Sequence, residues 1–106
     1  MNAKTVLCAF AFAALASAGY AAPTVVVDQK GMKFSVQTLT IKKGSTIRFT
    51  NSDPTVHNIF ITGESGRVDG GLQSPGHALN VPFMKAGAYQ VTCGIHPKMK
   101  LLVLVQ

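Results

Sequence analysis

Beyond Pro23 the sequence consists of short runs rich in β-branched and aromatic residues, separated by Gly, Pro, Asn and Asp. The stretch Thr46–Thr50 alternates most cleanly, so that Ile47 and Phe49 would share one face of a strand and Arg48 the other. No segment of this part shows a convincing apolar period of about 3.6 residues. A chain with this pattern is restricted to an all-β fold.

We predict about seven short strands, which favour an antiparallel β-sandwich or a small barrel. The first strand signal begins with Val25–Val27 and ends at Gly31, and the other signals cover residues 34–36, 39–41, 46–50, 56–62, 77–84, 88–93 and 101–105. The glycine-rich stretch Gly63–Gly76 is predicted to be the one long loop. Leu101–Val105 is apolar at every position, so both of its faces should be covered. We also place Met32 and Met84 in the core and His77 at an exposed strand edge.

The first residues are typical of a targeting signal and not of a part of the folded domain. Lys4 is followed by an apolar run and by the small residues Ala16, Ser17 and Ala18, which is the pattern of a secretory signal peptide. We predict a signal peptide over residues 1–18, cut after Ala18, with a cut after Ala21 as second choice. A membrane anchor would be the alternative, but the apolar run is shorter than the roughly 20 residues that a bilayer span needs. We therefore expect a periplasmic domain over residues 19–106 that does not stay inserted in the membrane.

Export changes the meaning of the cysteines. Cys8 would leave with the signal peptide, and loss of Lys4 lowers the formal net charge from +6 to +5. Cys93 would then be the only cysteine, and a lone thiol in an oxidising compartment is an oxidation hazard unless it is protected. The sequence leaves three roles open for it: an intermolecular bridge, an inert buried thiol, or a thiolate held by a metal ion.

The most informative stretch runs from Cys93 to Met99, with His96 between them. Gly94 and Pro97 argue against a helix, so we predict a tight loop between two strands. Tyr89, Val91 and Cys93 should point to the apolar face of the preceding strand. A further donor is available in His57. One thiolate, two imidazoles and one thioether form the set that suits a blue copper ion, with the thioether as a long axial ligand.

Taken one at a time, the same residues have simpler roles. Cys93 alone would more often be an inert core thiol, and His57 alone a turn or core histidine. Zinc would leave Met99 unused, because a thioether is a poor zinc ligand. A Cys–His nucleophile would need a third orienting group near Cys93, and the sequence offers none there. We therefore do not predict an enzyme. Nucleic acid is not an expected partner, because the lysines are not interleaved with aromatic residues.

Two motifs together resemble a known family. Asn51-x-Asp53-x3-His57-Asn58 is followed by Gly87-x-Tyr89-x-Val91-x-Cys93-x2-His96-Pro97-x-Met99, which is similar to the cupredoxins, the plastocyanin, pseudoazurin and amicyanin group of type I copper proteins. The short spacing from His96 to Met99 is most similar to that of amicyanin. The resemblance implies a Greek-key β-sandwich that binds one copper ion, cycling between Cu(I) and Cu(II).

By this resemblance, the copper ligands would be His57, Cys93, His96 and Met99, and Asn58 would tie the two ligand loops together. Electrons would enter and leave at the surface formed by Ile95, His96 and Pro97.

The expected function is that of an exported carrier of single electrons between redox proteins. The positive charge suggests partners with acidic docking faces, and we expect a monomer. The alternative is a periplasmic protein that binds or delivers copper without carrying electrons, and a third possibility is a module in which copper is structural.

Overall fold

The computed structural model describes residues 22–64 and 66–106, so the signal peptide predicted for residues 1–18 lies outside them. The described residues form eight β-strands, and none of them forms a helix with the length and apolar character that a membrane span requires. The strands are β1 (Thr24–Gln29), β2 (Thr38–Ile41), β3 (Thr46–Asn51), β4 (His57–Gly63), β5 (Gly66–Gln73), β6 (Ala78–Pro82), β7 (Gly87–Thr92) and β8 (Lys100–Val105).

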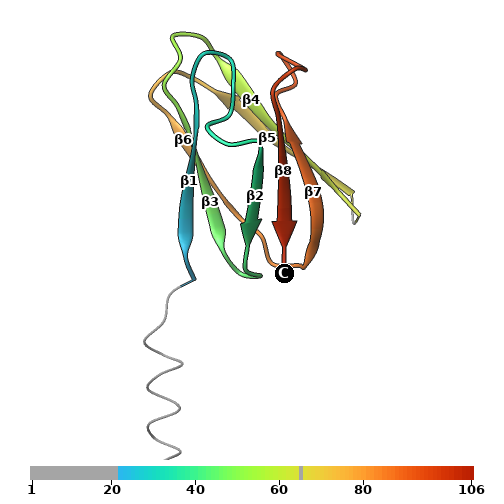
Figure 1. The fold of residues 1–106 in the computed structure, drawn as a ribbon. Coiled ribbons are helices and arrows are strands. Elements are labelled where there is room, and N and C mark those ends of the chain that lie inside the picture. Colours follow the sequence, from blue (N-terminus) through green and yellow to red (C-terminus); the bar gives the residue numbers. More distant parts are fainter. Residues whose placement is uncertain (1–21, 65) are drawn as a thin grey trace, which may run out of the picture.

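The strands form two sheets that face each other (Figure 1). One sheet has the order β1-β3-β6, and the other has the order β2-β8-β7-β4-β5. The all-β sandwich predicted from the alternating pattern is confirmed. The pairings are mixed rather than purely antiparallel, because β1 runs parallel to β3 and β2 runs parallel to β8. These neighbours are not successive in the chain, so no hairpin forces them into opposite directions.

The prediction of a loop over Gly63–Gly76 is wrong, since most of this stretch is strand β5, paired antiparallel to β4. Within the strand, Gly70 and Gly71 serve close packing and a bulge, whereas Gly66 and Gly76 lie next to the turns that flank β5. A Cβ on Gly70 would lie 2.6 Å from the Leu79 side chain, and Gly71 has a φ of 80° that favours glycine. The register between β4 and β5 shifts at this point, between Asn58 and Phe60.

The core lies between the two sheets and is built by alternation along each strand. Ile47 and Phe49 are buried while Arg48 is exposed, as the pattern predicts. Cys93 is buried on the same face as Val91, which confirms the predicted orientation of the thiol. The residues with no exposed surface that fill the core are Val27, Ile47, Phe49, Ile59, Val91, Cys93, Leu101 and Val103.

Four apolar positions do not lie where the sequence predicts. Strand β8 is not covered on both faces: Leu101 is buried, but Leu102 and Leu104 are 36% and 37% exposed on the outer face. Met32 and Met84, predicted to be core residues, are 51% and 65% exposed. Met32 belongs to a turn after β1 and has a φ of 56°, and Met84 lies between β6 and β7, so neither occupies an inward strand position. His77 is exposed next to β6, as predicted.

One end of the sandwich gathers four connections that are distant in sequence. The segments between β1 and β2, β3 and β4, β5 and β6, and β7 and β8 all lie at the end opposite the C-terminus (Figure 1). The β7–β8 connection carries the Cys93–Met99 loop, and the β3–β4 connection leads directly into His57. The sheet topology therefore places the two predicted ligand segments at the same end of the molecule.

Adjacent leucines on β8 provide a direct test of this arrangement. Leu101→Ala removes a fully buried side chain, and we expect it to lower the free energy of unfolding by about 2–5 kcal/mol. Leu102→Ala makes the same chemical change on the outer face and should cost less than about 1 kcal/mol. Urea unfolding of both variants measures the difference. Similar losses for the two variants would contradict the orientation of β8.

Candidate metal centre

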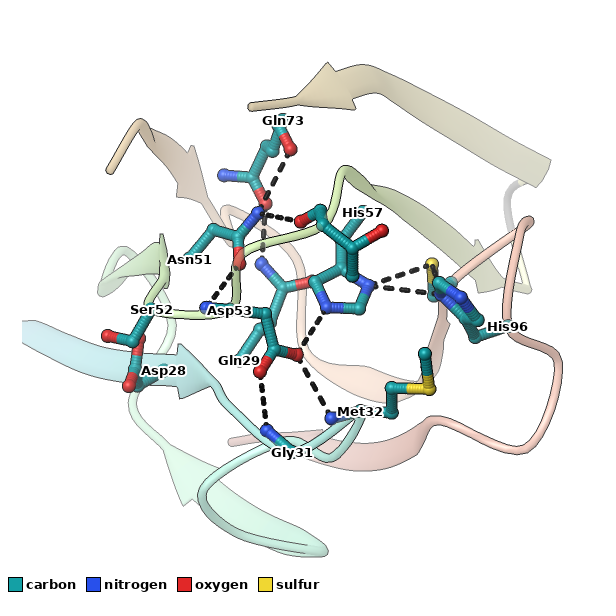
Figure 2. Close-up of polar contacts among 12 residues, drawn as sticks. Asp28, Gln29, Gly31, Met32, Asn51, Ser52, Asp53, His57, Gln73 and His96 are labelled. Carbon is teal, nitrogen blue, oxygen red and sulfur yellow. Dashed lines mark hydrogen bonds and ion pairs between the residues drawn. The ribbon is translucent and has the colours of Figure 1, made fainter. Parts of the chain in front are cut away.

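Three donor atoms from the two connections face one another. Cys93 Sγ lies 3.7 Å from His57 Nδ1 and 3.8 Å from His96 Nδ1, and the two Nδ1 atoms are 3.2 Å apart (Figure 2). The two imidazole rings are oriented edge to face, with centroids 5.0 Å apart. Of the predicted ligands, His57, Cys93 and His96 are thus brought together as one group that can hold a metal ion.

The size of this triangle fits a metal ion. Metal bonds of about 2.0–2.1 Å to nitrogen and about 2.3 Å to sulfur would separate the donors of a trigonal site by roughly 3.5–3.8 Å. The two sulfur–nitrogen separations, 3.7 and 3.8 Å, agree with that range, and the nitrogen–nitrogen separation of 3.2 Å is slightly shorter. A thiolate with two imidazoles suits copper, which binds both sulfur and nitrogen donors in either oxidation state.

The donors differ in their access to solvent. His57 and Cys93 have no exposed surface, whereas His96 is half-buried. Met99, the predicted axial ligand, is buried as well, and its backbone N–H donates a hydrogen bond to the His96 carbonyl across 3.0 Å. This turn closes the loop and confirms that Cys93–Met99 is not helical. Of the three donors in the triangle, His96 is therefore the one that brings the site to the surface.

Asn58 links the segments that carry the ligands. Its side-chain amide donates to the Gly71 carbonyl and to Asp69 Oδ1, both at 2.9 Å, and its Oδ1 accepts a hydrogen bond from the Gly94 N–H at 3.2 Å. The Asn58 backbone N–H points at Cys93 Sγ across 3.3 Å. Hydrogen bonds from Asn58 and then from the Gly71 N–H hold the pKa of Asp69 below its ordinary value. Hydrogen bonds from Asn58 therefore join the segment that carries His57 to the loop that carries Cys93, at the residue for which the family resemblance implies this role.

Gly94 is required by the same contact. A Cβ at this position would lie 2.9 Å from the Asn58 side-chain oxygen, closer than such atoms normally approach. The glycine therefore lets the loop after Cys93 come near enough to bond Asn58.

The opposite nitrogen of His57 contacts a carboxylate. His57 Nε2 lies 2.7 Å from Asp53 Oδ2, and Asp53 is only 7% exposed (Figure 2). Burial acts to raise the pKa of Asp53, but hydrogen bonds from His57 and from two backbone amides outweigh it and hold the pKa below its ordinary value. Asp53 belongs to the sequence motif, but the sequence predicts no role for it. The available signal is its spacing of four residues from a candidate ligand, which carries little information by itself.

A shallow apolar depression surrounds the exposed edge of His96. Its volume is about 320 Å³, and it is lined by Met32, Ile95, His96, Pro97, Lys98 and Met99. Ile95 is about half exposed. A second depression next to it is bordered by three lysines, Lys33, Lys98 and Lys100. The surface at this end of the molecule thus has an apolar centre with positive charge on one flank.

A β-sandwich with a buried thiol and two imidazoles converging at one end defines a small metal-binding protein. Comparisons with known proteins give the family: the model of the cupredoxin-like domain matches residues 3–105. Amicyanin of Paracoccus denitrificans is 32% identical over 94 residues, which cover 86% of this chain and 72% of that protein. The chain belongs to the cupredoxins, as its motifs indicate.

Two further matches agree. Chloroplastic plastocyanin of Chlamydomonas reinhardtii is 32% identical over 94 residues, covering 78% of this chain and 65% of that protein. A solved structure of an amicyanin mutant with Cu(I) superposes with a TM-score of 0.73 at 27% identity, covering 78% of this chain and 82% of that chain.

The hydrogen bonds of Asn58 can be tested in the metal-free protein. Asn58→Ala removes three side-chain bonds from a mostly buried position, and we expect the free energy of unfolding to fall by about 1–3 kcal/mol. Asn80→Ala is the control, because Asn80 accepts one exposed hydrogen bond from Arg48, and its loss should cost less than about 0.5 kcal/mol. Urea unfolding compares the two. Equal effects would show that Asn58 does not link the ligand segments.

Proposed function

We propose that this cupredoxin is an exported blue copper electron carrier. Copper would be held by Cys93 Sγ and by the Nδ1 atoms of His57 and His96, and the Met99 thioether would be a weaker fourth ligand. The observation that carries the proposal is the triangle of one sulfur and two nitrogens at 3.2–3.8 Å. Its donors suit copper in both oxidation states, which is what a one-electron carrier requires.

The protein supplies the geometry, and the bound copper supplies the change of charge by one electron. Cys93 and His57 are fixed inside the sandwich, so their donor atoms have little freedom to move when the charge changes. The Asn58 N–H stabilises negative charge on the Cys93 sulfur. Little rearrangement between the two oxidation states favours rapid electron transfer. The role is therefore that of a carrier and not of a catalyst that transforms a substrate.

Partners would dock on the surface around His96. The half-buried His96 ring is the part of the triangle nearest to solvent, and Ile95 and Pro97 lie beside it in the apolar depression. Lys33, Lys98 and Lys100 border the adjacent depression. We therefore propose redox partners whose docking face has an apolar centre and acidic groups on one side. The signal-like residues 1–18 support a periplasmic location for this encounter.

The first test is the visible spectrum of the purified protein with Cu(II). We expect an intense blue band from charge transfer between the Cys93 thiolate and copper, lost on reduction by one electron for each ion. Cys93→Ser should abolish the band, whereas His77→Ala, which changes an exposed histidine outside the triangle, should leave it unchanged. Met99→Leu should keep copper and raise the reduction potential.

A colourless Cu(II) complex would overturn the blue copper assignment, and complete loss of copper in Met99→Leu would contradict its axial role. Rapid and reversible cycling between Cu(I) and Cu(II) supports the carrier. A blue protein that instead gives up its copper to a chelator within its cycling time would favour the alternative, a protein that delivers copper.

The second test concerns the charged flank. Lys98→Gln/Lys100→Gln removes two positive charges beside the exposed edge of His96, and Lys42→Gln/Lys43→Gln removes two at the turn between β2 and β3, at the other end of the sandwich (Figure 1). With ferricyanide as an anionic oxidant at about 0.01 M ionic strength, the first variant should be oxidised several-fold more slowly than the second. The difference should disappear near 1 M salt. Equal rates at low salt would contradict electron transfer through this face.

A further inference from the structure

We propose that Asp53 is a positioning residue, which fixes the orientation and tautomer of His57 and at the same time holds the Gly31–Met32 turn of the docking surface. The inference rests on the proposed function, because it concerns how the same site is kept in place. Asp53 Oδ2 lies 2.7 Å from His57 Nε2 and accepts the Met32 N–H at 3.0 Å, while Oδ1 accepts the Gly31 N–H at 2.6 Å (Figure 2).

The first step concerns the tautomer of His57. A neutral imidazole carries a proton on one nitrogen and a lone pair on the other, and an ionised carboxylate can only accept hydrogen bonds. With Asp53 at Nε2, the proton belongs on Nε2 and the lone pair on Nδ1. Nδ1 is the atom that faces Cys93 Sγ at 3.7 Å. The carboxylate therefore leaves the correct nitrogen free for a metal ion and increases its donor strength.

The second step concerns how Asp53 itself is held. Gly31 and Met32 have positive φ angles of 65° and 56°, and this turn directs two successive backbone N–H groups at the carboxylate. On its other side, the Asp53 N–H donates to Asn51 Oδ1 at 2.9 Å. A methionine rarely adopts a left-handed conformation, and the bonds to the carboxylate hold Met32 in it together with the hydrogen bond from the Lys30 N–H to the Lys33 carbonyl at 3.0 Å.

The third step connects the two ends of this network. Met32 lines the apolar depression together with His96, although it is distant from the ligand loop in sequence. The side chain of Met32 points toward the histidine pair in Figure 2. One carboxylate thus fixes a buried donor on one side and part of the surface for partners on the other. Removing its charge should disturb both, whereas a carboxylate with a merely structural role would affect only stability.

Asp28 provides the matched control. Its Oδ1 accepts hydrogen bonds from the hydroxyl groups of Thr50 at 2.7 Å and Ser52 at 2.9 Å, so it too is a carboxylate that links segments near this end of the sandwich. Within the described part of the chain, its hydrogen bonds do not involve a candidate ligand. Asp28→Asn and Asp53→Asn remove the same charge and keep the same shape.

The experiment compares these two variants with the unaltered protein. In Asp53→Asn, the side chain brings an N–H₂ group against either the His57 ring or the backbone N–H groups, so one of them loses its acceptor. We expect a 10–100-fold weaker affinity for Cu(II), which is about the loss seen when a residue that orients a metal ligand is removed. The reduction potential should rise, because the variant loses more affinity for Cu(II) than for Cu(I). The electron paramagnetic resonance spectrum should also change. Asp28→Asn should change the affinity less than about twofold and leave the potential and spectrum unchanged.

A second readout needs no copper. In the metal-free protein, nitrogen-15 NMR of the imidazole rings should show His57 as the tautomer protonated on Nε2, and Asp53→Asn should lose this strict preference. His57 protonated on Nδ1, or an unchanged potential and affinity in Asp53→Asn, would overturn the positioning role even if the variant were unstable. A protein that binds no copper but retains the Nε2 tautomer would overturn the proposed function and leave the Asp53–His57 arrangement supported.

Discussion

The candidate site depends above all on the contact between Asn58 and the loop that follows β7. Asn58 follows His57, Gly94 follows Cys93, and the hydrogen bond between Asn58 and Gly94 therefore sets how closely the two donors approach. The donors are 36 residues apart in the chain, yet Sγ and Nδ1 lie within 3.7 Å. Asn58 is itself hydrogen-bonded to β5, so the position of the donors also depends on how β5 pairs with β4 in the five-stranded sheet.

Much of this arrangement could be predicted because it follows from local patterns. Strand alternation fixes which face each side chain occupies, so the inward position of Cys93 followed from Tyr89 and Val91 alone. Gly94 and Pro97 excluded a helix by their backbone chemistry, and the structure confirms a turn there. The spacing of Cys93, His96 and Met99 is also local. His57 and Asn58 needed the family resemblance, because nothing in the sequence near them indicates which distant loop they meet.

The parts that could not be predicted depend on contacts between distant segments. The glycines of β5 are typical of a loop, but Gly70 is needed where the strand passes close to the Leu79 side chain. The unbroken apolar run over residues 101–105 does not indicate which face of β8 points outward, and only its packing in the sandwich leaves Leu102 and Leu104 exposed. The role of Asp53 depends on the amides of an earlier turn, at separations of 22 and 21 residues. No local pattern contains that information.

An electron carrier needs a rigid metal site and access for partners, and each of the two histidines meets one of these requirements. His57 is fully buried, with one nitrogen facing the thiol and the other held by Asp53, so its position is fixed from both sides. His96 is half-buried and borders the apolar depression, so it can lie against a partner. A site with two buried histidines would be rigid but isolated from partners, and one with two exposed histidines would be accessible but open to water. The asymmetry keeps the Cys93 sulfur away from solvent and leaves one imidazole edge at the surface.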